Sequence, residues 1–164
     1  MSYSDGKEVL KLKGTDLKRI DFSGANLSGA DLSLANLNGS DLSGASLAGT
    51  NLANVTLVRA FLGKTNFYGA DLRNANFEEA DLRGAKLSGF DLSGADFTRS
   101  NLSGANLSGA NLAGANLVRA YLLEANLEHS ILVDADLSEA YLYDANLAGA
   151  DLRRSTLSNT KLTG

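Results

Sequence analysis

The sequence predicts an all-β solenoid, a continuous coil of short extended segments joined by corners. Three observations support this fold class. Every fifth residue from Leu12 to Leu162 is Leu or Phe, small residues recur two positions before each of them, and the 164-residue chain contains no Pro. Because each coil of a solenoid buries its apolar side against its neighbours, one large apolar residue per short unit is enough to build a core.

The spacing of five is incompatible with the ordinary secondary structures. On an α-helix each residue advances by about 100°, so residues five apart would be separated by about 140° and would form no stripe. On a flat strand the side-chain period is two, and a spacing of five would place successive leucines on opposite faces. The pattern therefore requires a bend in every unit that turns the next Leu back toward a common axis.

The other positions of the unit agree with this interpretation. Two residues before the centre the residue is usually Ala, with Ser or Thr as substitutes, which suits a narrow interior. The residue just before the centre is mostly Asp or Asn, whose side chains bond to nearby backbone and favour turns. Two residues after the centre Gly recurs, because Gly tolerates a positive φ at a corner. The absence of Pro fits a fold in which nearly every backbone N–H bonds to the next coil.

Units such as Ala25-Asn26-Leu27-Ser28-Gly29 and Ala110-Asn111-Leu112-Ala113-Gly114 read A(D/N)LxG. This motif covers roughly residues 10–164 and resembles the repeat of the pentapeptide-repeat family. The resemblance implies a right-handed quadrilateral parallel β-helix, which this chain would form with about 7.5 four-sided coils.

The spacing alone is compatible with coils of three or of four five-residue sides. Four sides are favoured by two pairs of aromatic residues that lie 20 positions apart and would then stack. These pairs are Phe77 with Phe97, and Tyr121 with Tyr141.

The chain divides into a short leading segment and one repeat domain. We expect residues 1–9 to cap the first coil and residues 10–164 to form the β-helix, since an open solenoid end exposes unpaired backbone. The repeat runs through Leu162 with no helix after it, so we also consider an end-to-end homodimer through the C-terminal coil. The expected core includes Phe22, Leu27, Leu32, Phe67, Phe77, Phe97, Leu102 and Leu112.

Composition argues against several functional classes. With no Cys and a single histidine, His129, the chain offers neither a disulfide nor a thiolate or His-cluster metal site. The glycines lie five apart, unlike a phosphate-binding loop, and no unit is lengthened to build a pocket. We therefore expect no catalysis, no cofactor and no small-molecule substrate.

Partners and location follow from charge and hydropathy. No basic stripe indicates direct nucleic-acid binding. No apolar run is long enough to cross a membrane, and the first residues do not resemble a signal peptide. We therefore expect a cytoplasmic protein whose partner is another, unidentified protein.

Phe90 is the one large residue in a small-residue position beyond the first coil. With 20-residue coils its column neighbours are Ala70 and Ala110, which leave it room. We expect a local filler or a slight bulge here rather than a ligand site.

Two features of the surface are candidates for recognition. Residues 1–120 contain 12 basic and 12 acidic side chains, whereas residues 121–150 contain six acidic and no basic ones. In the same region, 20-residue coils bring exposed aromatic and apolar side chains together, rimmed by two carboxylates. This aromatic patch consists of Tyr121, Leu123, Glu124, Tyr141, Tyr143 and Asp144.

Each feature also has an interpretation without a partner. The acidic segment then only solubilises one end, and the tyrosines only stack across coils. A further outward column mixes charges and predicts a ladder of weak ion pairs. Its members are Arg59, Glu79, Arg99, Arg119 and Glu139.

The leading hypothesis is a non-enzymatic rod for protein–protein interaction or scaffolding that uses the aromatic patch. The resemblance supports this class, since most pentapeptide-repeat proteins have no known catalytic role and many come from cyanobacteria. The alternative is a DNA mimic that binds DNA gyrase or topoisomerase, as family members linked to quinolone resistance do. This chain departs from those members in its charge-neutral first 120 residues, its uninterrupted coils and its lack of a C-terminal dimerisation helix.

Overall fold

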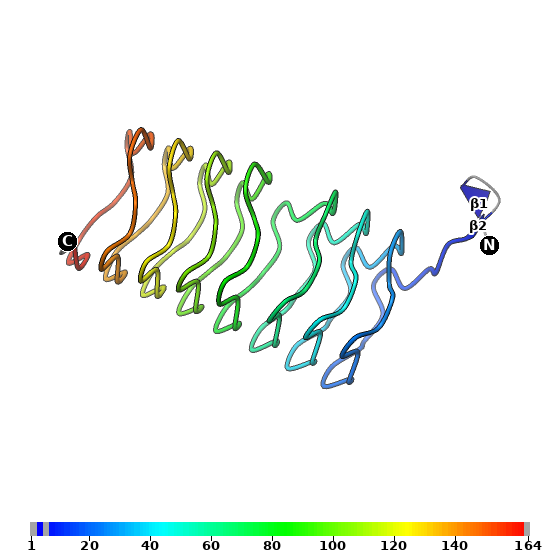
Figure 1. Ribbon diagram of the computed structural model, residues 1–164. Coiled ribbons are helices and arrows are strands. Elements are labelled where there is room, and N and C mark those ends of the chain that lie inside the picture. Colours follow the sequence, from blue (N-terminus) through cyan, green and yellow to red (C-terminus); the bar gives the residue numbers. More distant parts are fainter. Residues whose placement is uncertain (1–2, 5–6, 163–164) are drawn as a thin grey trace.

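The structure is a computed structural model that describes residues 3–4 and 7–162. Strands β1 (Tyr3–Ser4) and β2 (Lys7–Glu8) pair antiparallel into a short hairpin. The chain that follows winds into a rod of stacked coils, with the hairpin at its N-terminal end (Figure 1). The cap expected over residues 1–9 stays a prediction, because residues 1–2 and 5–6 lie outside the described part of the chain.

The coils have four sides. Every parallel bridge of the rod joins two residues that are 20 positions apart, from Lys11 with Asp31 at one end to Tyr141 with Lys161 at the other. Four five-residue units therefore complete one coil, which excludes the three-sided alternative. The residues that the structure describes contain no helix, so the predicted all-β solenoid is confirmed.

Each corner is a β-turn whose third residue has a positive φ, as the unit around Phe22 shows. Gly24 has a φ of 66°, and the Ala25 N–H donates to the Phe22 carbonyl at 2.9 Å. The Asp21 carboxylate accepts a hydrogen bond from the Ser23 N–H at 2.8 Å and fixes the entry into the turn. The same arrangement recurs along the rod, which confirms the predicted roles of the Asp/Asn and Gly positions.

Backbone hydrogen bonds between coils, called the ladder below, hold the stack together. In the unit around Leu27 the Leu27 N–H donates to the Ser46 carbonyl at 2.8 Å and the Ser46 N–H donates to the Ala25 carbonyl at 2.9 Å. A third bond, of 2.8 Å, joins the Gly29 N–H to the Ala48 carbonyl. Apart from one interruption described below, neighbouring coils are thus paired on every side, and most backbone polar groups are satisfied without helices or long strands.

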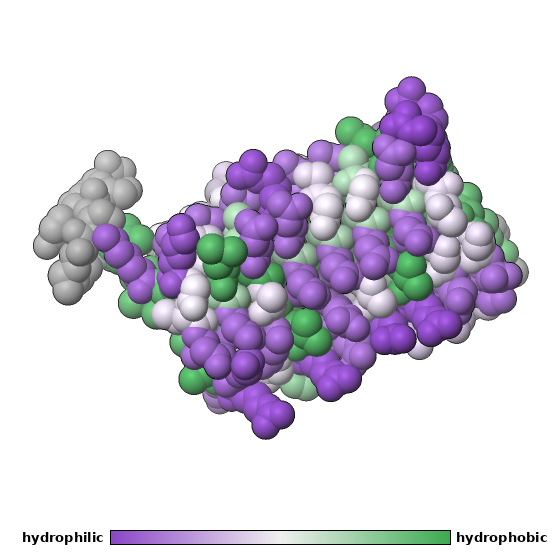
Figure 2. Space-filling model, turned by 180° about the vertical axis from the view of Figure 1, so that it is seen from behind, coloured by the Kyte–Doolittle hydropathy of each residue, from purple (hydrophilic) through white to green (hydrophobic). Residues whose placement is uncertain are grey.

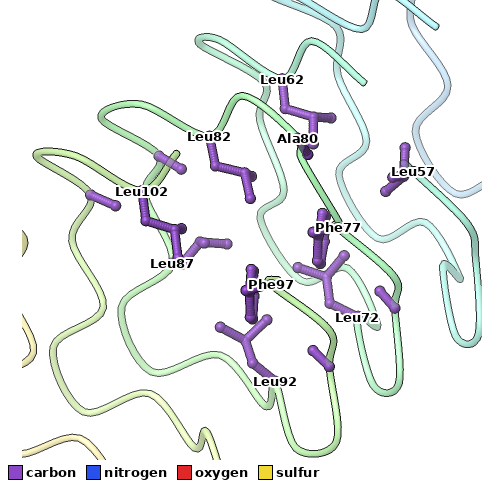
Figure 3. Close-up of a cluster of buried hydrophobic side chains, with 14 of the residues drawn as sticks. Leu57, Leu62, Leu72, Phe77, Ala80, Leu82, Leu87, Leu92, Phe97 and Leu102 are labelled. Atoms are coloured by element: carbon purple, nitrogen blue, oxygen red, sulfur yellow. The ribbon is translucent and has the colours of Figure 1, made fainter. Parts of the chain in front are cut away.

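The central Leu and Phe side chains fill the interior in columns. Figure 3 shows Leu62, Leu82 and Leu102 one above another on successive coils, each at most 1% exposed. The rings of Phe77 and Phe97 stack with centroids 5.0 Å apart and planes 5° from parallel. This close packing of identical positions explains why the Leu/Phe series tolerates no interruption.

One member of the expected core is less buried than predicted. Phe22 is only half-buried, because it lies in the first coil and is covered by a neighbouring coil on one side alone. The other seven expected core residues are at most 6% exposed. They are Leu27, Leu32, Phe67, Phe77, Phe97, Leu102 and Leu112.

The ladder has one interruption. Within the described coils, segments 64–72 and 83–91 lie on consecutive coils but share none of the six backbone bonds that this stretch would normally contain. The bonds on either side are intact, from the Leu62 N–H to the Asp81 carbonyl at 3.0 Å and from the Asn74 N–H to the Ser93 carbonyl at 3.2 Å. The two coils therefore separate locally and rejoin.

Phe90 accounts for this opening. Its ring occupies the inward position held by Ala70 one coil before and Ala110 one coil after. Coils spaced by about 4.8 Å leave no room for an aromatic ring above a small residue, so the backbone moves apart. The Asn111 N–H still donates to the Phe90 carbonyl at 2.9 Å, so the separation lies on the Ala70 side only. The expectation of a filler or slight bulge underestimated the effect.

Candidate functional site

The aromatic patch lies on one flat side of the last full coils. Tyr121 precedes the buried centre Leu122, and Tyr141 precedes Leu142 on the next coil. Leu123 and Tyr143 follow the same two centres. Because side chains alternate along each short extended segment, the residues on both sides of a buried centre point outward together.

The three tyrosines of the patch pack against one another. The rings of Tyr121 and Tyr141 stack with centroids 5.0 Å apart, and those of Tyr141 and Tyr143 lie 6.3 Å apart at 44°. Tyr121 is 44% exposed and Leu123 38% exposed, whereas Tyr141 and Tyr143 are half-buried. The structure thus brings the three tyrosines together on two coils, and the coil register places Leu123 one coil before Tyr143.

Apolar groups elsewhere on the rod are more scattered. Figure 2 shows a long side that is mostly hydrophilic, with apolar side chains in small separate spots. Phe61 shares the column of Tyr121 and is 53% exposed, but Asp81 and Asn101 lie between them. The column that contains Phe61, Tyr121 and Tyr141 therefore forms an aromatic cluster only in its C-terminal part.

The acidic rim of the patch carries free charge. Glu124 and Asp144 occupy left-handed corners, each with a φ of 55°, and both side chains are exposed. Neither forms an ion pair with another described residue. Two carboxylates therefore border the tyrosines without a compensating cation.

Other acidic residues of the segment 121–150 are neutralised by arginines outside it. Arg154 binds the Asp134 carboxylate through Nε at 2.6 Å, and Arg119 Nε lies 2.7 Å from Glu139 Oε2. These hydrogen bonds hold the pKa of both carboxyl groups below their usual values. The negative surface is therefore smaller than the sequence count indicates.

The predicted ion-pair ladder is confirmed in part of its column. Arg59 Nε lies 2.5 Å from Glu79 Oε2, and Arg99 approaches Glu79 at 3.8 Å from the other side. Arg119 pairs with Glu139 at 2.7 Å, while Arg99 and Arg119 are adjacent like charges. Exposed pairs of this kind stabilise a fold by roughly 0–1 kcal/mol each.

The interrupted ladder creates a second candidate site, which we call the cleft. It has a volume of about 730 Å³, within the range of ligand pockets. The sequence offered one signal for it, the aromatic residue Phe90 in a small-residue position. The cleft is lined by Lys64, Thr65, Asn66, Phe67, Tyr68, Arg83, Gly84, Ala85, Lys86, Ser88 and Phe90.

Residues 3–4 and 7–162 contain no group of three or more His, Cys, Asp or Glu side chains placed to hold a metal ion. In the same part of the chain there is no apolar helix of the length that a membrane span requires.

Comparison with known proteins identifies the family. A family model described as "Pentapeptide repeats" matches overlapping stretches of nearly the whole chain. These stretches are residues 11–44, 35–74, 50–89, 75–112, 100–132 and 120–159.

The chain belongs to the pentapeptide-repeat family.

Solved structures of the family share its right-handed quadrilateral β-helix. HetL, a pentapeptide-repeat protein involved in heterocyst differentiation regulation in the cyanobacterium Nostoc sp. strain PCC 7120, is 30% identical over 97% of this chain and 91% of its own, with a TM-score of 0.47. QnrB1, a plasmid-mediated fluoroquinolone resistance protein, is 20% identical over 94% of this chain and 84% of its own, with a TM-score of 0.55. No match was found among curated proteins.

Proposed function

We propose that this pentapeptide-repeat protein is a non-enzymatic rod that binds another protein through the aromatic patch. The observation that carries the proposal is the exposed stack of Tyr121 on Tyr141, extended by Tyr143 on the same flat side. Tyrosine rings supply rigid contact area with a polar tip, and they are enriched at protein interfaces.

The charge around the rings adds to this support. Glu124 and Asp144 are exposed carboxylates without an ionic partner among the described residues. A partner with a basic rim around an apolar centre would match the patch in both chemistry and sign. Because the surface is flat, a protein suits it better than a small molecule, which needs a concave site. We further propose that the interaction takes place in the cytoplasm, with which the lack of Cys is compatible.

A pull-down from host lysate tests the proposal. The wild-type protein is compared with the triple variant Tyr121→Ser/Tyr141→Ser/Tyr143→Ser after circular dichroism has shown that both are folded. A protein that is retained by the wild type and lost by the variant is the expected result. Equal recovery by both proteins would reject the aromatic patch as the contact surface.

Ile131→Ser is the matched control. Ile131 is 43% exposed, close to the 44% of Tyr121, but lies on the opposite side of the rod, two five-residue units away, and has no stacked partner. Recovery of the same protein by this control would show that loss of exposed apolar area alone does not abolish binding.

DNA mimicry is the second candidate. Duplex DNA carries one negative charge per roughly 1.7 Å of axis. Along this rod, carboxylates such as Asp71, Asp81 and Asp151 are each bound by an arginine two residues later, which reduces the free negative charge that a DNA mimic needs. Inhibition of gyrase supercoiling that disappears steeply with added salt would move this candidate to first place.

The C-terminal coil is a candidate for self-association, which we keep as a proposal. Leu157 is 43% exposed and Leu162 54% exposed, and Leu147 and Leu152 are only partly buried. A second copy stacked on this coil would bury these side chains and pair the backbone of both edges.

A further inference from the structure

The cleft is distinct from the aromatic patch and has a chemistry of its own. It opens where consecutive coils lose their ladder. The half-buried ring of Phe90 supplies apolar surface beside the buried Phe67, and Tyr68, 82% exposed, lines the mouth of the cleft. Unpaired main chain, aromatic side chains and a volume of about 730 Å³ occur together at this one place in the described coils. These properties define what can bind there.

The charge of the cleft is positive in a protein of net charge −4. Three cationic side chains line it, and no carboxylate does. Arg83 is held by Asp81 at 2.6 Å, but Lys64 and Lys86 form no ion pair with any described residue. An anionic occupant would therefore be attracted to two uncompensated lysines.

Segments 64–72 and 83–91 border the cleft and are called its two rims. Their unpaired backbone groups determine which kind of occupant can form hydrogen bonds there. On one rim the N–H groups of Phe67 and Gly69 lack the carbonyl partners that equivalent residues have on other coils. On the opposite rim the carbonyls of Lys86 and Ser88 lack their donors. An extended peptide offers carbonyls to the first rim and N–H groups to the second, whereas a small organic anion offers only acceptors.

The length and side-chain order of the peptide follow from the same geometry. The open side of the rod runs from the corner at Lys64 to the corner at Gly69, so about three extended residues, at about 3.3 Å each, would lie along it and the residues before and after them would reach the corners. In the coils, one central side chain per unit points inward and its two neighbours point outward. An inserted strand would likewise place an apolar side chain inward near Phe67 and Phe90 and acidic side chains outward near Lys64 and Lys86.

We propose that the cleft binds an extended acidic segment of a partner protein, inserted as a short strand between the two coils. This site lies outside the aromatic patch, and it does not depend on the function proposed for that patch. Each bound residue would restore part of the interrupted ladder, with the two lysines adding charge-assisted hydrogen bonds.

Fluorescence anisotropy with a defined probe tests the proposal. The probe is a fluorescein-labelled pentapeptide of sequence Glu-Leu-Glu-Leu-Glu, titrated with the full-length protein. Saturable binding, together with a slower amide exchange of Phe67 and Gly69 in the complex, is the expected result. No binding at millimolar protein, or binding without added protection of these amides, would overturn strand insertion.

Two peptide variants separate charge from backbone pairing. A Gln-Leu-Gln-Leu-Gln peptide should bind at least about tenfold more weakly, because it loses the charged contacts to the lysines. The acidic peptide with N-methylated backbone amides should also bind more weakly, because it cannot donate to the carbonyl rim. Equal binding of the N-methylated peptide, or displacement of the probe by phenylacetate or inorganic phosphate at similar concentrations, would show a small-anion site instead.

Matched protein variants locate the site. Lys64→Gln/Lys86→Gln should raise the Kd of the acidic probe at least about tenfold. Lys11→Gln/Lys13→Gln makes the same change of charge on exposed lysines of the first coil and should leave the Kd within about twofold. Equal effects of the two double variants would mean that the probe senses net charge and not the cleft.

Discussion

The rings of Tyr121 and Tyr141 stack in parallel on the surface, with centroids 5.0 Å apart and planes inclined by 5°. Phe77 and Phe97 stack with the same separation and inclination inside the core. The two members of each pair are 20 residues apart, so the 20-residue coil places one ring directly above the other in both cases. The difference is exposure, since the phenylalanines are fully buried and Tyr121 is 44% exposed. The surface pair therefore supports the coils and also remains accessible to a partner.

The tyrosine stack should contribute measurably to stability. Tyr121→Ser removes an aromatic pair and should lower the free energy of unfolding by about 1 kcal/mol in urea titrations. Ile131→Ser removes a side chain of similar exposure without a stacked partner and should cost less. Equal losses for the two variants would mean that the stack adds nothing beyond its buried area.

Gly24 and Gly63 should respond differently to substitution by Ala, because only Gly24 occupies a left-handed corner. Gly24 has a φ of 66° and nothing within 4 Å of an added Cβ, so Gly24→Ala costs only backbone strain, about 1–2 kcal/mol. Gly63 also has open space but no positive φ, so Gly63→Ala should be neutral or stabilising by up to about 1 kcal/mol. Thermal unfolding of both variants measures the difference, and equal shifts of the midpoint would contradict this explanation of the corners.

The protein should lose stability in acid through its arginine-bound aspartates. Hydrogen bonds from the arginine two residues later lower the pKa of Asp71, Asp81 and Asp151 below 3.8. Because the folded pKa lies below the unfolded one, this stabilisation is present above about pH 4 and is lost as the pH falls below 3.8.

The triple variant Asp71→Asn/Asp81→Asn/Asp151→Asn provides the test for acid sensitivity. Asn at this position keeps the turn bond, as Asn101 does by accepting from the Ser103 N–H at 3.1 Å, but it does not titrate. Urea titrations between pH 5 and pH 3 should therefore show a shallower decline than in the wild type. Parallel declines would assign acid unfolding to other groups.

Replacing Phe90 should close the cleft. Phe90→Ala places the same residue at this position as Ala70 and Ala110, so the missing ladder bonds should form. Hydrogen exchange of the Phe67 and Gly69 amides should slow toward that of their equivalents one coil earlier, Leu47 and Gly49, which donate at 2.8 Å. Unchanged exchange would mean that Phe90 is not the cause of the opening.

The C-terminal coil should control self-association. If two copies stack through this end, Leu157→Lys/Leu162→Lys places like charges in the contact and should shift the protein to a monomer in analytical ultracentrifugation. Leu34→Lys is the control, since Leu34 is 57% exposed at a corner away from the last coil. A wild type that sediments as a monomer at high concentration would reject end-to-end stacking.

Much of the molecule could be predicted because one short period determines it. The Leu/Phe series and the 20-residue coil were enough to place Tyr121, Tyr141 and Tyr143 in contact. Phe22 was mispredicted because burial depends on how many coils cover a position as well as on its place in the unit. End effects of this kind are absent from a purely periodic pattern.

The remaining features depend on packing across coils. The effect of Phe90 follows from its fit against Ala70 within a fixed coil spacing, and residue type alone does not show whether the backbone yields. The acidic segment was overestimated because Arg119 and Arg154, outside it in sequence, reach Glu139 and Asp134 from adjacent coils. Both effects appear only once residues 20 apart are placed side by side.

Site-specific photo-cross-linking tests the central claim most directly. A photoreactive benzoylphenylalanine is introduced at position 121, and in a control protein at position 131, and each protein is irradiated in cells of the source organism. We predict a discrete cross-linked protein from position 121 that is absent from position 131. Identical patterns from the two positions, or no cross-link from position 121, would contradict the assignment of the aromatic patch as the binding surface.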